Sequence, residues 1–142
     1  MVRVMASGVF DIIHTGHISY LTQAKSMGDE LVVVVACDST VRARKHEPVT
    51  PEKMRAEIVG MLKPVDKVII GGTGDMMETV AEIKPDIIVL GFDQSFDPDR
   101  LRKELESRGM GGIRVVRAKE CADDLNATRR IIEKIRRTGE RE

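Results

Sequence analysis

The sequence predicts an α/β fold: a single-domain, doubly wound (Rossmann-like) five-stranded parallel sheet with helices on both faces. Short β-branched runs alternate along the chain with segments whose apolar residues recur at helical spacing. This alternation is typical of parallel strands joined by helical crossovers. The length of 142 residues suits one such domain. We expect the domain to span residues 1–137 and residues 138–142 to form a flexible tail.

Five apolar runs are expected to form the strands. They cover residues 3–10, 31–38, 66–70, 85–93 and 112–118. Because strands of a parallel sheet are buried on both faces, such runs are apolar throughout instead of alternating. In this fold ligands bind beyond the carboxyl ends of the strands, where the strand order reverses. The loops that follow the strands are therefore the places to search for function.

Five amphipathic segments are expected to form the helices. They cover residues 17–27, 49–62, 74–84, 97–109 and 126–137. In the second, Thr50 is expected as N-cap and Pro51 at the first helical position, and Gly109 is expected to end the fourth. The inward faces of the second and last helices are expected to carry Met54, Ile58, Met61 and Leu62, and Ile131, Ile132 and Ile135.

Composition excludes several classes of protein. Lys+Arg and Asp+Glu both number 23, so no basic surplus indicates a general nucleic-acid binder. No apolar run approaches the roughly 18 residues of a membrane span, and the amino terminus lacks the apolar core of a signal peptide. We expect a cytoplasmic protein without a membrane partner. Cys37 and Cys121 form no C-x-x-C pattern and are expected to be free thiols.

The loop after the first strand, "GVFDIIHTGH" at residues 8–17, carries the strongest chemical signal. A helix that begins near Gly16 presents free N–H groups and a positive dipole end, which together bind phosphate. Gly8 and Gly16 let the backbone approach a ligand closely. His14 and His17 can converge on one bound phosphate. Two other interpretations stay open: a capping and a packing histidine, or a zinc site.

These residues resemble the G-x-F-D-x-x-H-x-G-H signature of the small nucleotidyltransferases related to glycerol-3-phosphate cytidylyltransferase. The resemblance extends over most of the chain, including "CDSTVRARKHEPVTPEKMRAEIV" and "VLGFD". Within this family the sequence is most similar to the archaeal-type FAD synthases, on "GFDQ" and the late cysteine in "AKECADDLN". The resemblance implies transfer of AMP from ATP to FMN, with in-line attack on the α-phosphate and release of pyrophosphate.

The resemblance also implies a set of site residues. His14, His17 and Lys45 are expected to be catalytic, with Arg44 as the competing register for the lysine. The nucleotide is expected to contact Val9, Phe10, His14, Thr15, Gly16, His17, Lys45, Arg55, Asp93, Thr128 and Arg129. Asp11 is expected to brace its turn. No protein metal site is expected, because Mg²⁺ would be bridged mainly by nucleotide phosphates.

Several alternatives remain at this point. Asn126 and Ala127 replace the hydroxyl residues usual before the last helix, and Phe10, Tyr20, Phe92 and Phe96 are the only aromatic residues that could contact a flavin. A CTP-dependent cytidylyltransferase acting on a polyol phosphate such as glycerol 3-phosphate is the second interpretation, and a nucleotide-binding sensor without turnover is the third. The run "GGTGD" resembles a dinucleotide fingerprint, but Met77 replaces its third glycine. A homodimer is expected by resemblance only.

Overall fold

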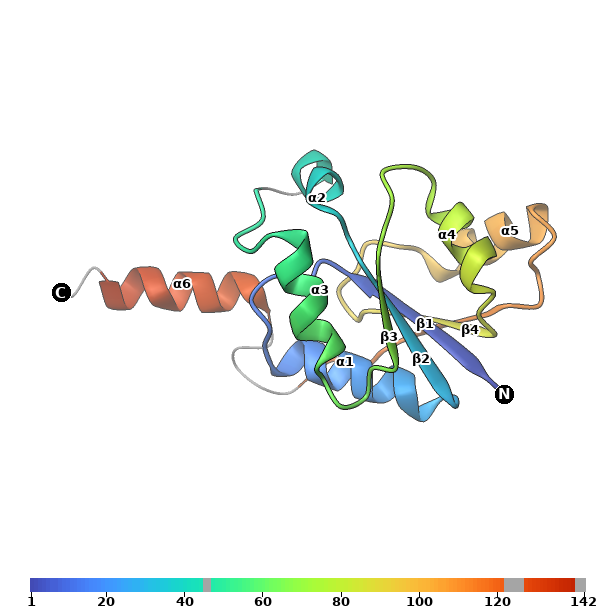
Figure 1. Ribbon diagram of the computed structural model, residues 1–142, viewed down its shortest axis with the longest axis horizontal. Coiled ribbons are helices and arrows are strands. Elements are labelled where there is room, and N and C mark those ends of the chain that lie inside the picture. Colours follow the sequence, from blue (N-terminus) through green and yellow to red (C-terminus); the bar gives the residue numbers. More distant parts are fainter. Residues whose placement is uncertain (45–46, 122–126, 140–142) are drawn as a thin grey trace.

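The computed structural model describes residues 1–44, 47–121 and 127–139. Its centre is one parallel five-stranded sheet in the order β3-β2-β1-β4-β5 (Figure 1). The strands are β1 (Arg3–Gly8), β2 (Glu30–Val35), β3 (Lys67–Ile70), β4 (Ile87–Leu90) and β5 (Arg114–Arg117). The predicted sheet is confirmed. Each strand is shorter than its apolar run, because the chain turns out of the sheet as soon as a loop begins.

The helices lie at α1 (Thr15–Ser26), α2 (Asp38–Arg44), α3 (Glu52–Gly60), α4 (Met76–Ile83), α5 (Pro98–Ser107) and α6 (Thr128–Gly139). The sequence predicted α2 as part of a loop; its seven residues bury only Val41. The Asp97 side chain caps α5, and Gly109 follows that helix at φ 77°, as its sequence position predicts. Helix α6 extends into the predicted tail as far as Gly139.

Two separate cores form on the two faces of the sheet. Helices α1 and α3 pack on one face, where Leu21, Ala24 and Val59 are buried against the strands. Helices α4 and α5 cover the other face, with Val80 and Leu105 among the buried residues. Because apolar residues of β1, β2 and β4 are buried in both cores, the sheet is the doubly wound structure that the sequence predicts.

The expected inward face of α3 is wrong for three of its four residues, whereas Leu62, just after the helix, packs against the core as expected. Met54, Ile58 and Met61 are 47%, 37% and 83% exposed, whereas Arg55 and Val59 are buried. The hydrogen bonds of Arg55 explain this orientation. Arg55 reaches the carbonyl oxygens of Val9 and Ala36 only when its side of the helix lies against the sheet. The helix also begins one residue later than predicted, with Pro51 at the N-cap position.

The expected packing of α6 is wrong as well. This helix projects away from the sheet (Figure 1) and buries none of its residues. Ile135 is 60% exposed, although the periodicity placed it inward. Sequence periodicity shows that a helix has an apolar face, but it does not show what covers that face. No helix in the described ranges is long and apolar enough to cross a membrane.

Candidate active site

The candidate site lies where the strand order reverses, between β1 and β4. These neighbouring strands are parallel, so the loops after Gly8 and after Leu90 leave the same edge of the sheet. The first of them, residues 9–14, leads into α1 with its two histidines. The second, residues 91–96, contains Asp93. Elements far apart in the sequence therefore meet at one edge.

His14 and His17 form a reciprocal cap at the start of α1. His14 Nδ1 accepts a hydrogen bond from the Gly16 N–H at 3.0 Å, and His17 Nδ1 accepts one from the His14 N–H at 3.2 Å. The two rings stack with centroids 3.8 Å apart. Because Nδ1 is the acceptor in both rings, the neutral tautomer carries its proton on Nε2. Each histidine thus keeps one N–H donor that the cap does not use.

Both imidazoles are held neutral. Burial, helped by the neighbouring His14, lowers the pKa of His17 to about 3, although Asp11 opposes the shift. Burial also lowers the pKa of His14 below its usual value, against the raising effect of Asp93. In the absence of an anion, the pair is therefore a set of neutral hydrogen-bond donors.

The backbone before the histidines is strained. Phe10 and Ile12 have φ values of 56° and 51°, a region that β-branched and aromatic residues rarely adopt. The Phe10 ring folds back over Gly8, where a Cβ atom would approach it within 3.1 Å. The ring is buried and contacts His17 and Tyr20 at centroid distances of 5.3 and 6.3 Å. Phe10 therefore packs from the core against the ring of His17.

Asp11 ties this loop to the segment before α3. Its carboxylate accepts hydrogen bonds from the Val49 N–H, the Thr50 N–H and the Thr50 hydroxyl at 2.7, 2.9 and 2.6 Å. Burial raises the pKa of the Asp11 carboxyl, but these bonds together with Arg55 bring it below the usual value. Asp11 braces the structure, as expected, although it braces a distant segment rather than its own turn.

Arg55 has a different surrounding from the one expected of a nucleotide ligand. Its side chain is fully buried and donates hydrogen bonds to the carbonyl oxygens of Val9, Ala36 and Thr50. A 2.6 Å ion pair with Asp38 completes its contacts. Since these partners engage all three guanidinium nitrogens, Arg55 supports the loops and strand ends around the site.

Thr128 also contacts the histidine loop. Its hydroxyl donates to the carbonyl oxygen of Asp11 at 2.5 Å, which brings the start of α6 to the site. Arg129 follows on the exposed side of the helix. Thr15 is exposed at the start of α1. Lys45, the third expected catalytic residue, lies outside the described residues, as does Asn126.

The structure adds two residues that the sequence did not single out. Arg117 at the end of β5 and Gln94 both make hydrogen bonds to the backbone of the 91–96 loop. An arginine at the carboxyl end of an apolar strand is the sequence signal for the first. Among the four aromatic residues, Phe10 and Tyr20 lie in the core, whereas Phe92 is 43% exposed on this loop.

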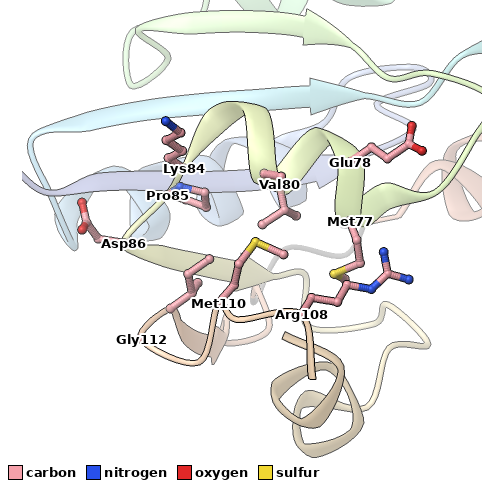
Figure 2. Close-up of a pocket in the computed structure, with 11 residues that line it drawn as sticks. Met77, Glu78, Val80, Lys84, Pro85, Asp86, Arg108, Met110 and Gly112 are labelled. Carbon is pink, nitrogen blue, oxygen red and sulfur yellow. The ribbon is translucent and has the colours of Figure 1, made fainter. Parts of the chain in front are cut away.

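A groove lies away from the candidate site. This open groove, with a volume of about 810 Å³, lies between α4 and the segment from Arg108 to Ile113, and Figure 2 shows the residues that line it. Met77, Val80 and Met110 form its apolar floor. The residues expected at the nucleotide site do not line it. The glycines of "GGTGD" do not line it either; they follow the edge strand β3, where Gly71 is partly buried and Gly72 and Gly74 are exposed.

Protein ligands for a metal are scarce in the part of the chain that is described. No group of three or more His, Cys, Asp or Glu side chains there is arranged to hold an ion. The Asp11 carboxylate is engaged by Val49 and Thr50.

The parallel sheet and the histidine pair at the start of α1 define the class: an α/β protein whose candidate site lies at the carboxyl edge of the sheet. The chain belongs to the cytidylyltransferase-like family, whose profile matches residues 5–135. It is 54% identical over 136 residues to an FAD synthase of Aciduliprofundum boonei, covering 95% of this chain and 91% of that protein. An FAD synthase of Thermoplasma acidophilum is 51% identical, with 95% and 94% covered.

Solved structures agree with this assignment. The lipopolysaccharide core biosynthesis protein from Thermoplasma volcanium matches with a TM-score of 0.83 and 50% identity, over 85% of this chain and 98% of that one. A protein of unknown function from Archaeoglobus fulgidus has a TM-score of 0.68 and 21% identity, over 83% and 90%, and shows the fold alone. The family predicted from the sequence is confirmed.

Proposed function

We propose that this protein is an FMN adenylyltransferase, an FAD synthase that joins ATP and FMN to give FAD and pyrophosphate. The observation that carries the proposal is the histidine pair, whose two Nε2–H donors stand at a helix amino terminus beside the 91–96 loop. The FAD synthases at about half identity over nearly the whole chain support the choice of substrates.

The reaction follows from this arrangement. A phosphate oxygen of FMN attacks the α-phosphorus of ATP, and the bond from that phosphorus to the bridging oxygen of the β-phosphate breaks. Pyrophosphate leaves in line with the attacking oxygen, and the new linkage is the diphosphate of FAD. Little covalent work falls to the protein, so the rate depends on positioning and on stabilisation of negative charge.

His14 and His17 supply that stabilisation. Their Nε2–H groups donate to the α-phosphate and to the bridging oxygen, where charge accumulates as pyrophosphate departs. The reciprocal cap and the stacking hold both rings in place before substrate arrives. Since the donors are already oriented, little reorganisation is needed during the reaction.

Other groups complete the proposal. Lys45 and Arg129 neutralise the polyphosphate, and the positive dipole end of α1 attracts one phosphate. Mg²⁺, held by phosphate oxygens, would supply further neutralisation of the triphosphate. The cytoplasmic location and the homodimer stay predictions.

Pyrophosphate release tests the proposal. The protein is incubated with Mg²⁺ and each pairing of ATP or CTP with FMN or glycerol 3-phosphate. Release with ATP and FMN alone, with FAD appearing in equal amount, supports the proposal. Release with CTP and glycerol 3-phosphate would instead establish the cytidylyltransferase alternative. Nucleotide binding without release in any pairing would indicate the sensor.

A further inference from the structure

Arg117 makes an unusual set of contacts at the carboxyl end of β5. Its guanidinium donates to the carbonyl oxygens of Gly91 and Gln94, each at 2.9 Å, and to those of Phe92 and Phe96. All four acceptors belong to the 91–96 loop, more than twenty residues earlier in the chain. The planar fork of a guanidinium can reach several carbonyl groups at once, which an ammonium group cannot do in the same geometry.

Gln94 fastens the same loop from inside. Its side-chain oxygen accepts from the Gly91 N–H, and its amide nitrogen donates to the Ser7 carbonyl oxygen of β1, both at 2.8 Å. The folded-back side chain lies 3.2 Å from where a Cβ atom of Gly91 would stand, so glycine is the residue that leaves room for it. The 91–96 loop is thus attached to β5 by Arg117 and to β1 by Gln94.

This double attachment fixes what the loop presents. Phe92 and Asp93 are exposed on it, whereas Gly91 is buried and Gln94 is partly buried. Asp93 lies close enough to His14 for its charge to oppose the lowering of the His14 pKa. A binding loop held at both sides by a rigid sheet keeps its contact groups in place without help from the ligand.

We propose that Arg117 is a positioning residue for nucleotide binding, because its guanidinium holds the 91–96 loop in the conformation that presents Phe92 and Asp93 beside the histidine pair. The inference rests on the proposed function in taking ATP as the ligand of this loop. It assigns to Arg117 no contact with the reacting atoms. Loss of the guanidinium should therefore weaken ATP binding and leave the chemical step nearly intact.

Kinetics of three variants test this. In Arg117→Ala we expect the KM for ATP to rise by about tenfold while kcat falls by less than about threefold and the KM for FMN stays unchanged. Arg117→Lys should behave like Arg117→Ala, because one ammonium group cannot replace the fork. The matched control is Arg102→Ala, which removes a guanidinium that donates to the Val115 carbonyl oxygen of the same strand and not to the loop.

Chemical rescue separates the loop role from general destabilisation. Guanidinium ion at about 10 mM should restore the KM for ATP in Arg117→Ala, and methylammonium at equal ionic strength should not. An unchanged KM for ATP in Arg117→Ala, an equal rise in Arg102→Ala, or equal rescue by methylammonium would each overturn the proposal.

A fluorescence readout keeps the inference independent of the reaction. The chain contains no tryptophan, so Phe92→Trp places a single reporter on the loop. Adding Arg117→Ala should increase acrylamide quenching of this tryptophan, and guanidinium ion should reverse the increase. Unchanged quenching would refute the role of Arg117 whatever the enzyme catalyses. A quenching change in a protein that makes no FAD would support the attachment and reject the proposed reaction alone.

Discussion

The hydroxyl of Thr128 donates a 2.5 Å hydrogen bond to the carbonyl oxygen of Asp11, across 117 positions of the sequence. This bond joins the first residue of α6 to a loop in which Phe10 and Ile12 have left-handed backbone conformations. Such conformations persist only where neighbouring structure enforces them. Three hydrogen bonds hold the loop in this conformation. Arg55 donates to the Val9 carbonyl oxygen, Thr128 donates to the Asp11 carbonyl oxygen, and the Asp11 carboxylate accepts from the Thr50 hydroxyl.

Replacing Thr128 should therefore reduce activity through the histidine loop. We expect Thr128→Val, which keeps the shape and removes the donor, to destabilise the fold by about 1 kcal/mol and to lower kcat. Thr128→Ser, which keeps the hydroxyl, should retain both properties near the original level. Urea denaturation and steady-state kinetics on the two variants provide the measurement. Equal activity in both variants would show that the hydroxyl is dispensable.

The cap and the catalytic role of His14 can be separated by two substitutions. His14→Asn keeps a side-chain acceptor for the Gly16 N–H, whereas His14→Ala loses it at a cost of about 1 kcal/mol. Both remove the Nε2–H donor, so both should lower kcat on the order of 10²-fold. The check is a thermal melt beside a pyrophosphate assay. If His14→Asn kept its activity and only the less stable His14→Ala lost it, activity would depend on the cap, and a role of His14 in charge stabilisation would be contradicted.

Stability should fall as the pH drops below the usual histidine range. Burial lowers the pKa of His17 to about 3 in the folded chain, while the unfolded chain titrates near 6.5. Between these values the unfolded state binds the extra proton, so the stability present above about pH 6.5 is lost progressively on acidification. Urea midpoints at pH 5 and pH 7.5 measure this difference.

His17→Asn is the matched variant for that experiment, since an asparagine oxygen can still accept from the His14 N–H. It should show a smaller midpoint difference between pH 5 and pH 7.5 than the original protein. His14 contributes in the same direction, because its pKa is also lowered by burial. An unaltered difference in His17→Asn would mean that His17 titrates alike in the folded and unfolded chains.

Shortening a side chain should reduce stability much more on the buried side of α3 than at the exposed Met61 that follows the helix. Val59 is fully buried, so Val59→Ala should destabilise the protein by about 2 kcal/mol. Met61 is 83% exposed, and Met61→Ala should change stability by less than about 0.5 kcal/mol. Guanidinium denaturation of both variants decides between this face assignment and the one that apolar periodicity predicts.

Periodicity and motif alone predicted much of the molecule. The five strands, five of the six described helices near their observed bounds and the left-handed Gly109 all follow from local sequence. So does the histidine pair at the start of α1, because strand end, glycine and helix start are adjacent in the chain. These features depend on backbone preferences and on residues only a few positions apart.

Only the tertiary structure decided which side of α3 is buried, what Arg55 contacts, and how the 91–96 loop is held. Besides Thr50, Arg55 donates to backbone carbonyl groups 19 and 46 positions away. Asp11 accepts from backbone N–H groups 38 and 39 positions away. Arg117 donates to carbonyl groups between 21 and 26 positions away. A sequence pattern shows that a side chain is charged, but its partners are set by the strand order, which places distant loops at one sheet edge. By itself the sequence determined the chemistry of the site; packing of the sheet decided which residues face the ligand and which ones support them.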